Sequence, residues 1–583
     1  MSARPSFVWL WRLSCLLVLA TPVMADVRVS IEGVRGAVLK NIEAHLAISE
    51  LVARSAAGSR VSTAEVRRRH QRAPVDITNA LQALGYYQSQ VDSTLQRAEK
   101  DWIANYRIER GPPTRLRTIR IEVDGAAFTN IPPPEPDAEI YLVEGKRLHH
   151  GRYERTKEVL LESMRSEGYL DATMVQATLD VFPEQAAADV HWQITRGPRY
   201  EFGDIRLVQI ALNEAFARRY IQIQPGTPFN GAQLNNLQIR LINSGYFNEV
   251  AVGIEKEAAV DGRVPVTVTA TPRASQNYKL GLGFGTDTGP RVTTGIELRR
   301  LNPAGHRLRL DLQASRIRTQ GGLEYAIPVR DVHTDLLKFY TRAERADIGD
   351  ADSDQYTFGG RLEDGWLGLR RAMYLEYSHE VFNFGDGPNR VSDVFTPGIR
   401  LSVQKGDDLL FTRRGFSGSV DVHGGVKSLL SDTSFVHASA NATAVWPLTR
   451  SSRLILRGAI GVIEADDFDA LPPTQRFFTG GDRSVRGYAF ESLSPRNAAG
   501  DDIGGAHYFN QSVEVDKLIL RDFGIAAFYD RGGASETAFG GQHESAGIGF
   551  RYRSPVGMIR VDVAKPLDGT SGVRLHLGLG PDL

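Results

Sequence analysis

The sequence predicts three α+β repeats, each with the order βααββ, followed by a 16-stranded antiparallel transmembrane β-barrel. Three observations predict this architecture. At 583 residues the chain is too long for one ordinary domain. A pattern of helix, Gly-Tyr and strand recurs in its first half. After residue 273, the sequence changes to short segments in which polar and apolar residues alternate.

The first 25 residues are typical of a secretory signal peptide. Arginines precede an apolar run at 13–20, and cleavage is predicted between Ala25 and Asp26. The run is too short to span a bilayer as a helix. The only cysteine, Cys15, falls within this segment, so the predicted mature chain has no disulfide and no thiol chemistry. A secreted chain of this kind is periplasmic, extracellular or an outer-membrane barrel.

Two motifs repeat in step before residue 273. Predicted helices end in Gly-Tyr, where glycine suits the left-handed position after a helix; the three pairs are Gly85-Tyr86, Gly168-Tyr169 and Gly245-Tyr246. Arg-Gly-Pro turns between strands recur at 110–112 and 196–198. One larger α+β domain with chance similarities is the alternative, but two motifs in the same order and phase favour repeats. We expect domains at 26–112, 113–197 and 198–273, and a barrel at 274–583.

The barrel prediction rests on strands with one apolar face. In 278–285 the apolar face is Tyr278, Leu280, Leu282 and Phe284, and lysine and glycines occupy the other face. The stretches 307–314, 558–564 and 572–580 alternate likewise. At about ten residues per strand plus loops, the span after residue 273 holds roughly 16 strands. A soluble β-sandwich or propeller is the alternative, but a face of glycine and charge packs poorly against a second sheet. Polar segments at 345–355 and 389–395 are expected as loops outside the bilayer.

Signs of catalysis or of a cofactor site are weak. The sequence has neither a His-Glu-x-x-His motif nor a Gly-x-Ser-x-Gly elbow, and its 13 histidines are scattered. The glycines of 281–289 alternate as on a strand, and no helix follows to bind phosphate. Asp350, Asp352 and Asp354 allow a calcium loop, although a solvated acidic loop is favoured. Lysine plus arginine equals aspartate plus glutamate, at 69 each, which gives no sign of a nucleic-acid partner. We expect no enzyme, no cofactor and no metal.

The predicted loop "GGDRSVRGYAFESLSP", at 480–495, contains a motif that resembles the signature of a known superfamily. The repeats resemble POTRA domains, which are periplasmic, and the whole chain resembles the superfamily of outer-membrane insertases and two-partner secretion transporters. Its signature is Val-Arg-Gly-Phe/Tyr in the loop between barrel strands eleven and twelve, matched here by Val485, Arg486, Gly487 and Tyr488. Five strand-like segments follow the motif, which places eleven before it. A second Arg-Gly-Phe, at Arg414, leads into an alternating stretch and is interpreted as the start of a strand.

The resemblance also implies which wall residues meet the loop. The family's Phe-x-Asp-x-Gly on strand thirteen corresponds to Phe528, Asp530 and Gly532, and its Gly-x-Gly on strand fourteen to Gly547 and Gly549. An arginine folded into a barrel loses hydration, which is costly unless a carboxylate receives it. Guanidinium and carboxylate can pair through two hydrogen bonds. We expect the wall glycines to let the loop backbone approach. A flexible external loop with a solvated arginine is the alternative.

In its number of POTRA-like units and its length, the chain resembles the TamA group, whose members are the outer-membrane subunits of the translocation and assembly module. The resemblance implies an outer-membrane assembly factor with periplasmic POTRA domains. It would promote insertion or secretion of unfolded β-barrel clients such as autotransporters, in contact with outer-membrane lipid. Its partner would be a TamB-like protein anchored in the inner membrane. The seam between strands near 278–286 and 572–580 would expose edges that can template a client strand. A two-partner secretion pore and a BamA-like general insertase remain alternatives.

Overall fold

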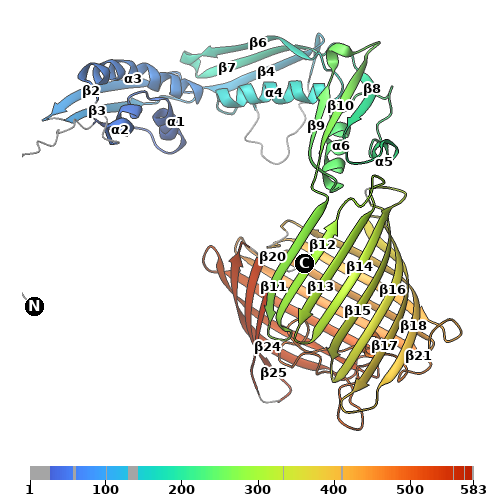
Figure 1. Cartoon of the computed structure of the whole chain (residues 1–583). Helices are drawn as coiled ribbons and strands as arrows, with labels where there is room; N and C mark the ends of the chain where they lie inside the picture. The colour runs from blue at the N-terminus through green and yellow to red at the C-terminus, as the bar shows by residue number, and fades with distance from the viewer. Residues whose placement is uncertain are drawn as a thin grey trace, which may run out of the picture. The chain divides into compact units, whose positions relative to one another are not determined.

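A computed structural model describes residues 27–56, 61–99, 101–128, 142–332, 334–408, 411–555, 557–569 and 572–580 (Figure 1). The predicted signal peptide and its cleavage site at Ala25 and Asp26 lie outside these residues. No helix in the described ranges is long and apolar enough to cross a membrane.

The first domain packs helices on a three-stranded sheet of order β1-β3-β2. Ser62 begins the longest helix, where its hydroxyl accepts a hydrogen bond from the backbone N–H of Glu65 at 3.1 Å. Three helices are present where the repeat pattern predicted two, because the charged stretch before this helix forms two short ones. The elements are β1 (Val27–Glu32), α1 (Ala37–His45), α2 (Ser49–Ala56), α3 (Thr63–Ala83), β2 (Gln90–Ala98) and β3 (Asp101–Glu109).

The second domain has a four-stranded sheet of order β5-β4-β7-β6. Trp192 on β7 is fully buried and meets the ring of Tyr153 on α4 edge-on, with centroids 5.3 Å apart. This contact fixes the helix on the sheet. The elements are β4 (Arg115–Val123), β5 (Ala126–Ala127), α4 (His150–Ser166), β6 (Thr173–Phe182), the 3₁₀ turn η1 (Pro183–Gln185) and β7 (Ala187–Thr195).

The third domain shows the predicted βααββ order. Its sheet runs β8-β10-β9, and the leucines of α6 are buried against it. The elements are β8 (Glu201–Val208), α5 (Glu214–Arg218), α6 (Gly231–Asn243), β9 (Phe247–Ile254), the 3₁₀ turn η2 (Lys256–Ala258) and β10 (Arg263–Pro272).

The Gly-Tyr motif ends a helix in each of the three domains. Gly85, Gly168 and Gly245 follow α3, α4 and α6 with φ of +83°, +102° and +78°. These angles lie in the left-handed region that glycine adopts at least cost. The helix-ending role predicted for the motif is confirmed.

A single 16-stranded antiparallel sheet forms the barrel, and each strand pairs with the next in chain order (Figure 1). The described residues show no backbone ladder between the first strand and the last, although these strands lie next to each other. The predicted fold class is confirmed as a nearly closed barrel. The strands are β11 (Gln276–Gly285), β12 (Gly289–Leu298), β13 (Arg307–Ser315), β14 (Arg318–Pro328), β15 (Leu336–Ile348), β16 (Ala351–Trp366), β17 (Leu369–Phe384), β18 (Arg390–Gly406), β19 (Gly415–Gly425), β20 (Phe435–Pro447), β21 (Ser452–Ala465), β22 (His507–Leu518), β23 (Phe523–Ser535), β24 (His543–Ser554), β25 (Gly557–Pro566) and β26 (Arg574–Gly580).

The strands alternate apolar and polar faces. On β11 the side chains of Leu280 and Leu282 are each 77% exposed, as expected of residues that face lipid. The predicted polar loops at 345–355 and 389–395 are wrong as loops, because strands continue through most of both. Across the β15–β16 pair, Arg345 and Asp354 form two hydrogen bonds of 2.6 and 2.7 Å, which extends the hairpin with charged side chains.

Candidate functional site: a loop folded into the barrel

Residues 466–506 connect β21 to β22 and pack against the barrel wall. The loop contains the 3₁₀ turn η3 (Pro473–Gln475), whose Thr474 hydroxyl donates to the buried carboxylate of Glu380 on β17. Arg476 is 6% exposed and donates to three backbone carbonyls of the loop itself, at 3.0 to 3.1 Å. These contacts fix the first part of the loop to the wall and give it an internal scaffold.

Two glycines then turn the chain. Gly480 and Gly481 have φ of +111° and +98°, and a side chain on Gly480 would collide with the carbonyl of Ala489. The hydroxyl of Ser484 accepts a hydrogen bond from the Gly480 N–H at 2.8 Å. Glycine is therefore required at the bend that carries the chain to Arg486.

Arg486 is 5% exposed and meets Asp530, whose exposed fraction is 0%. Its Nε and Nη2 each donate to one carboxylate oxygen of Asp530 at 2.8 Å, and its backbone N–H donates to Oδ2 at 3.2 Å. The guanidinium carbon lies 3.3 Å from the ring centroid of Phe528, which packs the cation against an aromatic face. Loop and wall thus make a paired, bidentate contact that is shielded from water.

Further acceptors complete the pocket around the same guanidinium. Nη1 donates to Glu514 at 2.9 Å and to Asp562 at 3.0 Å, and Nη2 donates to the hydroxyl of Ser512 at 3.2 Å. That hydroxyl in turn donates to Asp530 at 2.7 Å. All five N–H bonds of the guanidinium have acceptors near them, so burial leaves the charge well compensated.

The acceptors belong to a larger charged network on the inner faces of neighbouring strands. Arg551 donates to Glu514 at 2.6 Å and also pairs with Asp562 and Asp516. Arg457 reaches Glu514 at 3.0 Å, and Arg453 reaches Asp516 at 2.7 Å. The members are Arg453, Arg457, Arg486, Arg551, Glu514, Asp516, Asp530 and Asp562. Four positive and four negative charges therefore balance within the network.

The rest of the predicted motif also packs on the wall. Val485 is fully buried with Tyr488 and Leu493. The Gly487 N–H donates to the hydroxyl of Ser545 at 3.1 Å, and a Cβ on Gly487 would lie 2.6 Å from the Ser545 Cβ. The ring of Tyr488 meets that of His543 edge-on at 5.1 Å. The close approach of loop to wall therefore depends on the glycine of the loop.

The wall glycines Gly532, Gly547 and Gly549 lie close to other groups of the wall. A side chain on Gly547 would collide with the ring of Phe528, and one on Gly549 would collide with the side chains of Asp562 and Arg551. Gly532 is crowded by the backbone of β22. The atoms nearest to these positions belong to the wall, so the expectation that the wall glycines admit the loop backbone stays a prediction. Gly547 and Gly549 leave room for Phe528 and Asp562, which contact Arg486.

A cluster of two histidines and one aspartate lies on β19 and β20, which precede the loop in the sequence. Asp421, His423 and His437 have possible ligand atoms within 4.8 Å of one another. Asp421 is already engaged by Arg400 at 2.8 Å and by the hydroxyl of Tyr374 at 3.0 and 3.1 Å. A carboxylate paired with arginine is a poor metal ligand. His423 Nε2 lies 2.9 Å from the Gln475 side-chain oxygen, so the cluster makes a polar contact between wall and loop.

Two of the three acidic residues at 350–354 likewise have protein partners. Asp354 is held by Arg345, and one Asp350 carboxylate oxygen accepts the Asp502 N–H at 2.7 Å.

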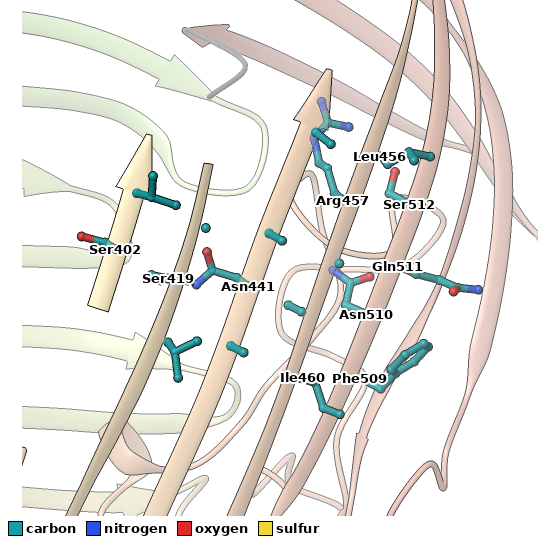
Figure 2. Close-up of a pocket in the computed structure, with 18 of the residues that line it drawn as sticks. Ser402, Ser419, Asn441, Leu456, Arg457, Ile460, Phe509, Asn510, Gln511 and Ser512 are labelled. Carbon is teal, nitrogen blue, oxygen red and sulfur yellow. Dashed lines mark hydrogen bonds between the residues drawn. The ribbon is translucent and has the colours of Figure 1, made fainter. Parts of the chain in front are cut away.

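A shallow hollow of about 850 Å³ lies over strands β18 to β22 (Figure 2). Besides small and apolar residues, its lining includes Asn441, Arg457, Asn510, Gln511 and Ser512, and the Ser512 hydroxyl is part of the arginine pocket.

Comparison with known proteins agrees with this architecture. Residues 301–581 match the Omp85 superfamily domain. Residues 28–110 match the POTRA domain described as TamA domain 1, and residues 200–273 match a POTRA domain described as a surface antigen variable number repeat.

Two curated relatives are outer membrane protein assembly factors named BamA. The one from Neisseria meningitidis serogroup B is 20% identical over 475 residues, 75% of this chain and 59% of the relative. The one from Nitratidesulfovibrio vulgaris is 26% identical over 384 residues, 62% of this chain and 48% of the relative. The chain thus spans about half to three fifths of the length of these relatives.

A solved structure shows the same fold. BamA from Haemophilus ducreyi lacking POTRA domains 1–3 superposes with a TM-score of 0.67 at 17% identity, covering 80% of this chain and 99% of that one. The barrel accordingly lies in the outer membrane, with the POTRA domains in the periplasm. Together these matches make the barrel similar to the Omp85 superfamily domain, and the first and third N-terminal domains similar to POTRA domains.

Proposed function

We propose that this protein is a non-enzymatic assembly factor that promotes insertion or secretion of β-barrel clients, such as autotransporters, at the outer membrane. The observation that carries the proposal is the seam. Among the described residues, β11 and β26 lie side by side without a backbone ladder. Unpaired strand edges can receive an incoming strand. Partly apolar client segments could then pass from the periplasm to lipid along this edge.

Within that role, Arg486 and Asp530 hold the loop in the barrel and keep the wall near the seam in one arrangement. The support is the buried bidentate contact and the balanced charge around it. A passive porin would not need POTRA domains ahead of the barrel.

A function of the TamA kind is favoured by the first domain, since residues 28–110 match a POTRA domain described as TamA domain 1. In that case a TamB-like protein, anchored in the inner membrane, is the partner, and the first domain is where we expect it to bind. A BamA-like general insertase is the second candidate, favoured by the curated relatives and by the barrel superposition.

The test is a chromosomal deletion followed by outer-membrane proteomics. The full chain, a chain lacking 26–112 and a chain lacking 26–272 are each returned behind the native signal segment. A TamA-like factor predicts loss of a subset of barrel proteins, restored by the full chain alone. A general insertase predicts loss of most barrel proteins. Loss of one exoprotein, with substantial conductance of the purified barrel, would identify a secretion pore. An unchanged proteome, or full rescue without 26–272, contradicts the proposal.

A further inference from the structure

The seam between the first and last barrel strands is bridged by few direct contacts. β11 ends at Gly285 and β26 begins at Arg574. The Leu577 N–H donates to the hydroxyl of Thr286 at 3.3 Å. By contrast, every other neighbouring pair of strands in the barrel has a continuous ladder. Closure of the seam must therefore depend on other groups.

The inward-folded loop reaches the last strand through His576. This side chain is 5% exposed, and its Nε2 lies 2.6 Å from the backbone carbonyl oxygen of Arg486. A carbonyl only accepts, so Nε2 carries the proton and donates. The residue whose guanidinium binds the wall thus uses its carbonyl to hold β26.

The same loop reaches the other side of the seam through Asp287, in the turn between β11 and β12. The Asp482 N–H donates to Asp287 Oδ2 at 2.7 Å. A Cβ on Gly481 would lie 2.6 Å from that oxygen, so the approach requires glycine. His576 Nδ1 also lies 3.6 Å from Asp287 Oδ1, so the two side chains face each other across the seam.

We infer that the loop is a clamp for the seam and that His576 and Asp287 are its positioning residues. Asp482 and Arg486 lie four positions apart on one short segment, and each holds one of two strands that do not pair with each other. Because the segment is anchored to β23 through Asp530, it fixes both edges relative to the wall. Loss of either contact releases one edge and leaves the barrel strands otherwise paired.

The clamp would regulate the opening of the seam in the proposed function. Only this biological role of the clamp rests on the proposed function. A ladder would require several backbone hydrogen bonds to break together before a client could enter. Two side-chain contacts to a loop can be broken singly. Each such hydrogen bond contributes about 0.5–1.5 kcal/mol net, so its loss shifts the ratio of open to closed seam by roughly two- to tenfold.

The experiment measures the seam directly in the full chain. In a Cys15→Ser background no cysteine remains. Spin labels are placed on exposed positions of the two edge strands, through Leu282→Cys and Leu575→Cys. Distances are measured by double electron–electron resonance in nanodiscs of phosphatidylethanolamine and phosphatidylglycerol. The parent should give one short distance. His576→Ala and Asp287→Ala should each add a longer component, raising its share two- to tenfold.

Conservative variants separate clamping from general stability. His576→Gln keeps a donor for the Arg486 carbonyl, and Asp287→Asn keeps an acceptor for the Asp482 N–H, so both should restore the short distance. Gly481→Ala should open the seam without altering either strand. The matched control is His543→Ala, which removes a histidine that touches the same loop at Tyr488, away from the seam.

Parent-like distances in His576→Ala, Asp287→Ala and Gly481→Ala would overturn the clamp. So would an equal opening in His543→Ala. If a strand variant does not fold, as judged by heat-modifiable gel mobility, the Gly481→Ala result decides. No client is present in this measurement. If the variants open the seam as expected but deletion of the gene leaves the outer-membrane proteome unchanged, the clamp is preserved and the proposed function is refuted.

Discussion

Removal of the Arg486 side chain should strongly destabilise the barrel. Arg486→Ala deletes a buried cation and leaves Asp530 and its neighbouring carboxylates with one positive charge fewer. Breaking a buried ion pair by removing one partner costs about 3–5 kcal/mol. We expect a loss of unfolding free energy in this range, because the wall strands cannot rehydrate the carboxylates without opening.

Asp530→Ala should cost less than Arg486→Ala. Without Asp530 the guanidinium still has Glu514 at 2.9 Å and Asp562 at 3.0 Å. Without Arg486, Asp530 keeps only the hydroxyl of Ser512 among these partners. The double variant should be less destabilised than the sum of the singles, with a coupling free energy of about 1–3 kcal/mol.

The assay is reversible urea unfolding of the full chain in lipid vesicles, followed by tryptophan fluorescence and gel mobility. Arg486→Lys tests geometry at constant charge, since an ammonium group cannot pair bidentately with a carboxylate. Arg414→Ala is the matched control, because that arginine belongs to the other Arg-Gly-Phe and stacks over Trp446 at 5.6 Å. Strictly additive effects of Arg486→Ala and Asp530→Ala, or an equal loss in Arg414→Ala, would refute the reasoning.

Other expectations concern single residues elsewhere. Gly547→Val should lower the urea midpoint of the barrel, since a side chain there meets the Phe528 ring. Trp192→Ala should destabilise the second domain by about 3–5 kcal/mol, measured by hydrogen exchange of β7 in the full chain. Arg117 lowers the pKa of Asp189 to about 2, against about 3.9 unfolded, so its stabilising effect is present above pH ~3.9 and lost as pH falls toward 2. Faster exchange of β7 in that window, absent in Asp189→Asn, tests this.

Much of the fold could be predicted because its signals are local. Glycine after a helix is a local requirement, and Gly85 and Gly168 mark helix ends without knowledge of the rest of the chain. Alternation with period two likewise identifies strands such as β11 and β22. The polar segment at 345–355 lies mostly in strands, although its composition predicts a loop, because charge on a strand that continues past the bilayer resembles charge in a turn.

The wall around Arg486 is only partly predictable, because the sequence does not show the pairing register of neighbouring strands. Period two shows that Glu514 and Asp562 share a polar face with other inward residues of their strands, but it does not show which residues lie opposite. Pairing of Ser512 with Asp530 and of Gly549 with Asp562 brings these groups together. Gly549 could be located by motif, yet its purpose depends on Asp562, thirteen residues later in the chain and on the next strand.

The charge of the wall explains why the loop should stay in place when the seam opens. Without Arg486 the network has three arginines and four carboxylates, so a buried wall would carry one uncompensated negative charge. Withdrawal of the loop therefore costs several kcal/mol, about the cost of breaking a buried pair. The contacts of His576 and Asp287 are single hydrogen bonds of about 0.5–1.5 kcal/mol each. The weaker contacts should break first, so an edge strand moves away from a loop that remains bound to the wall through Asp530.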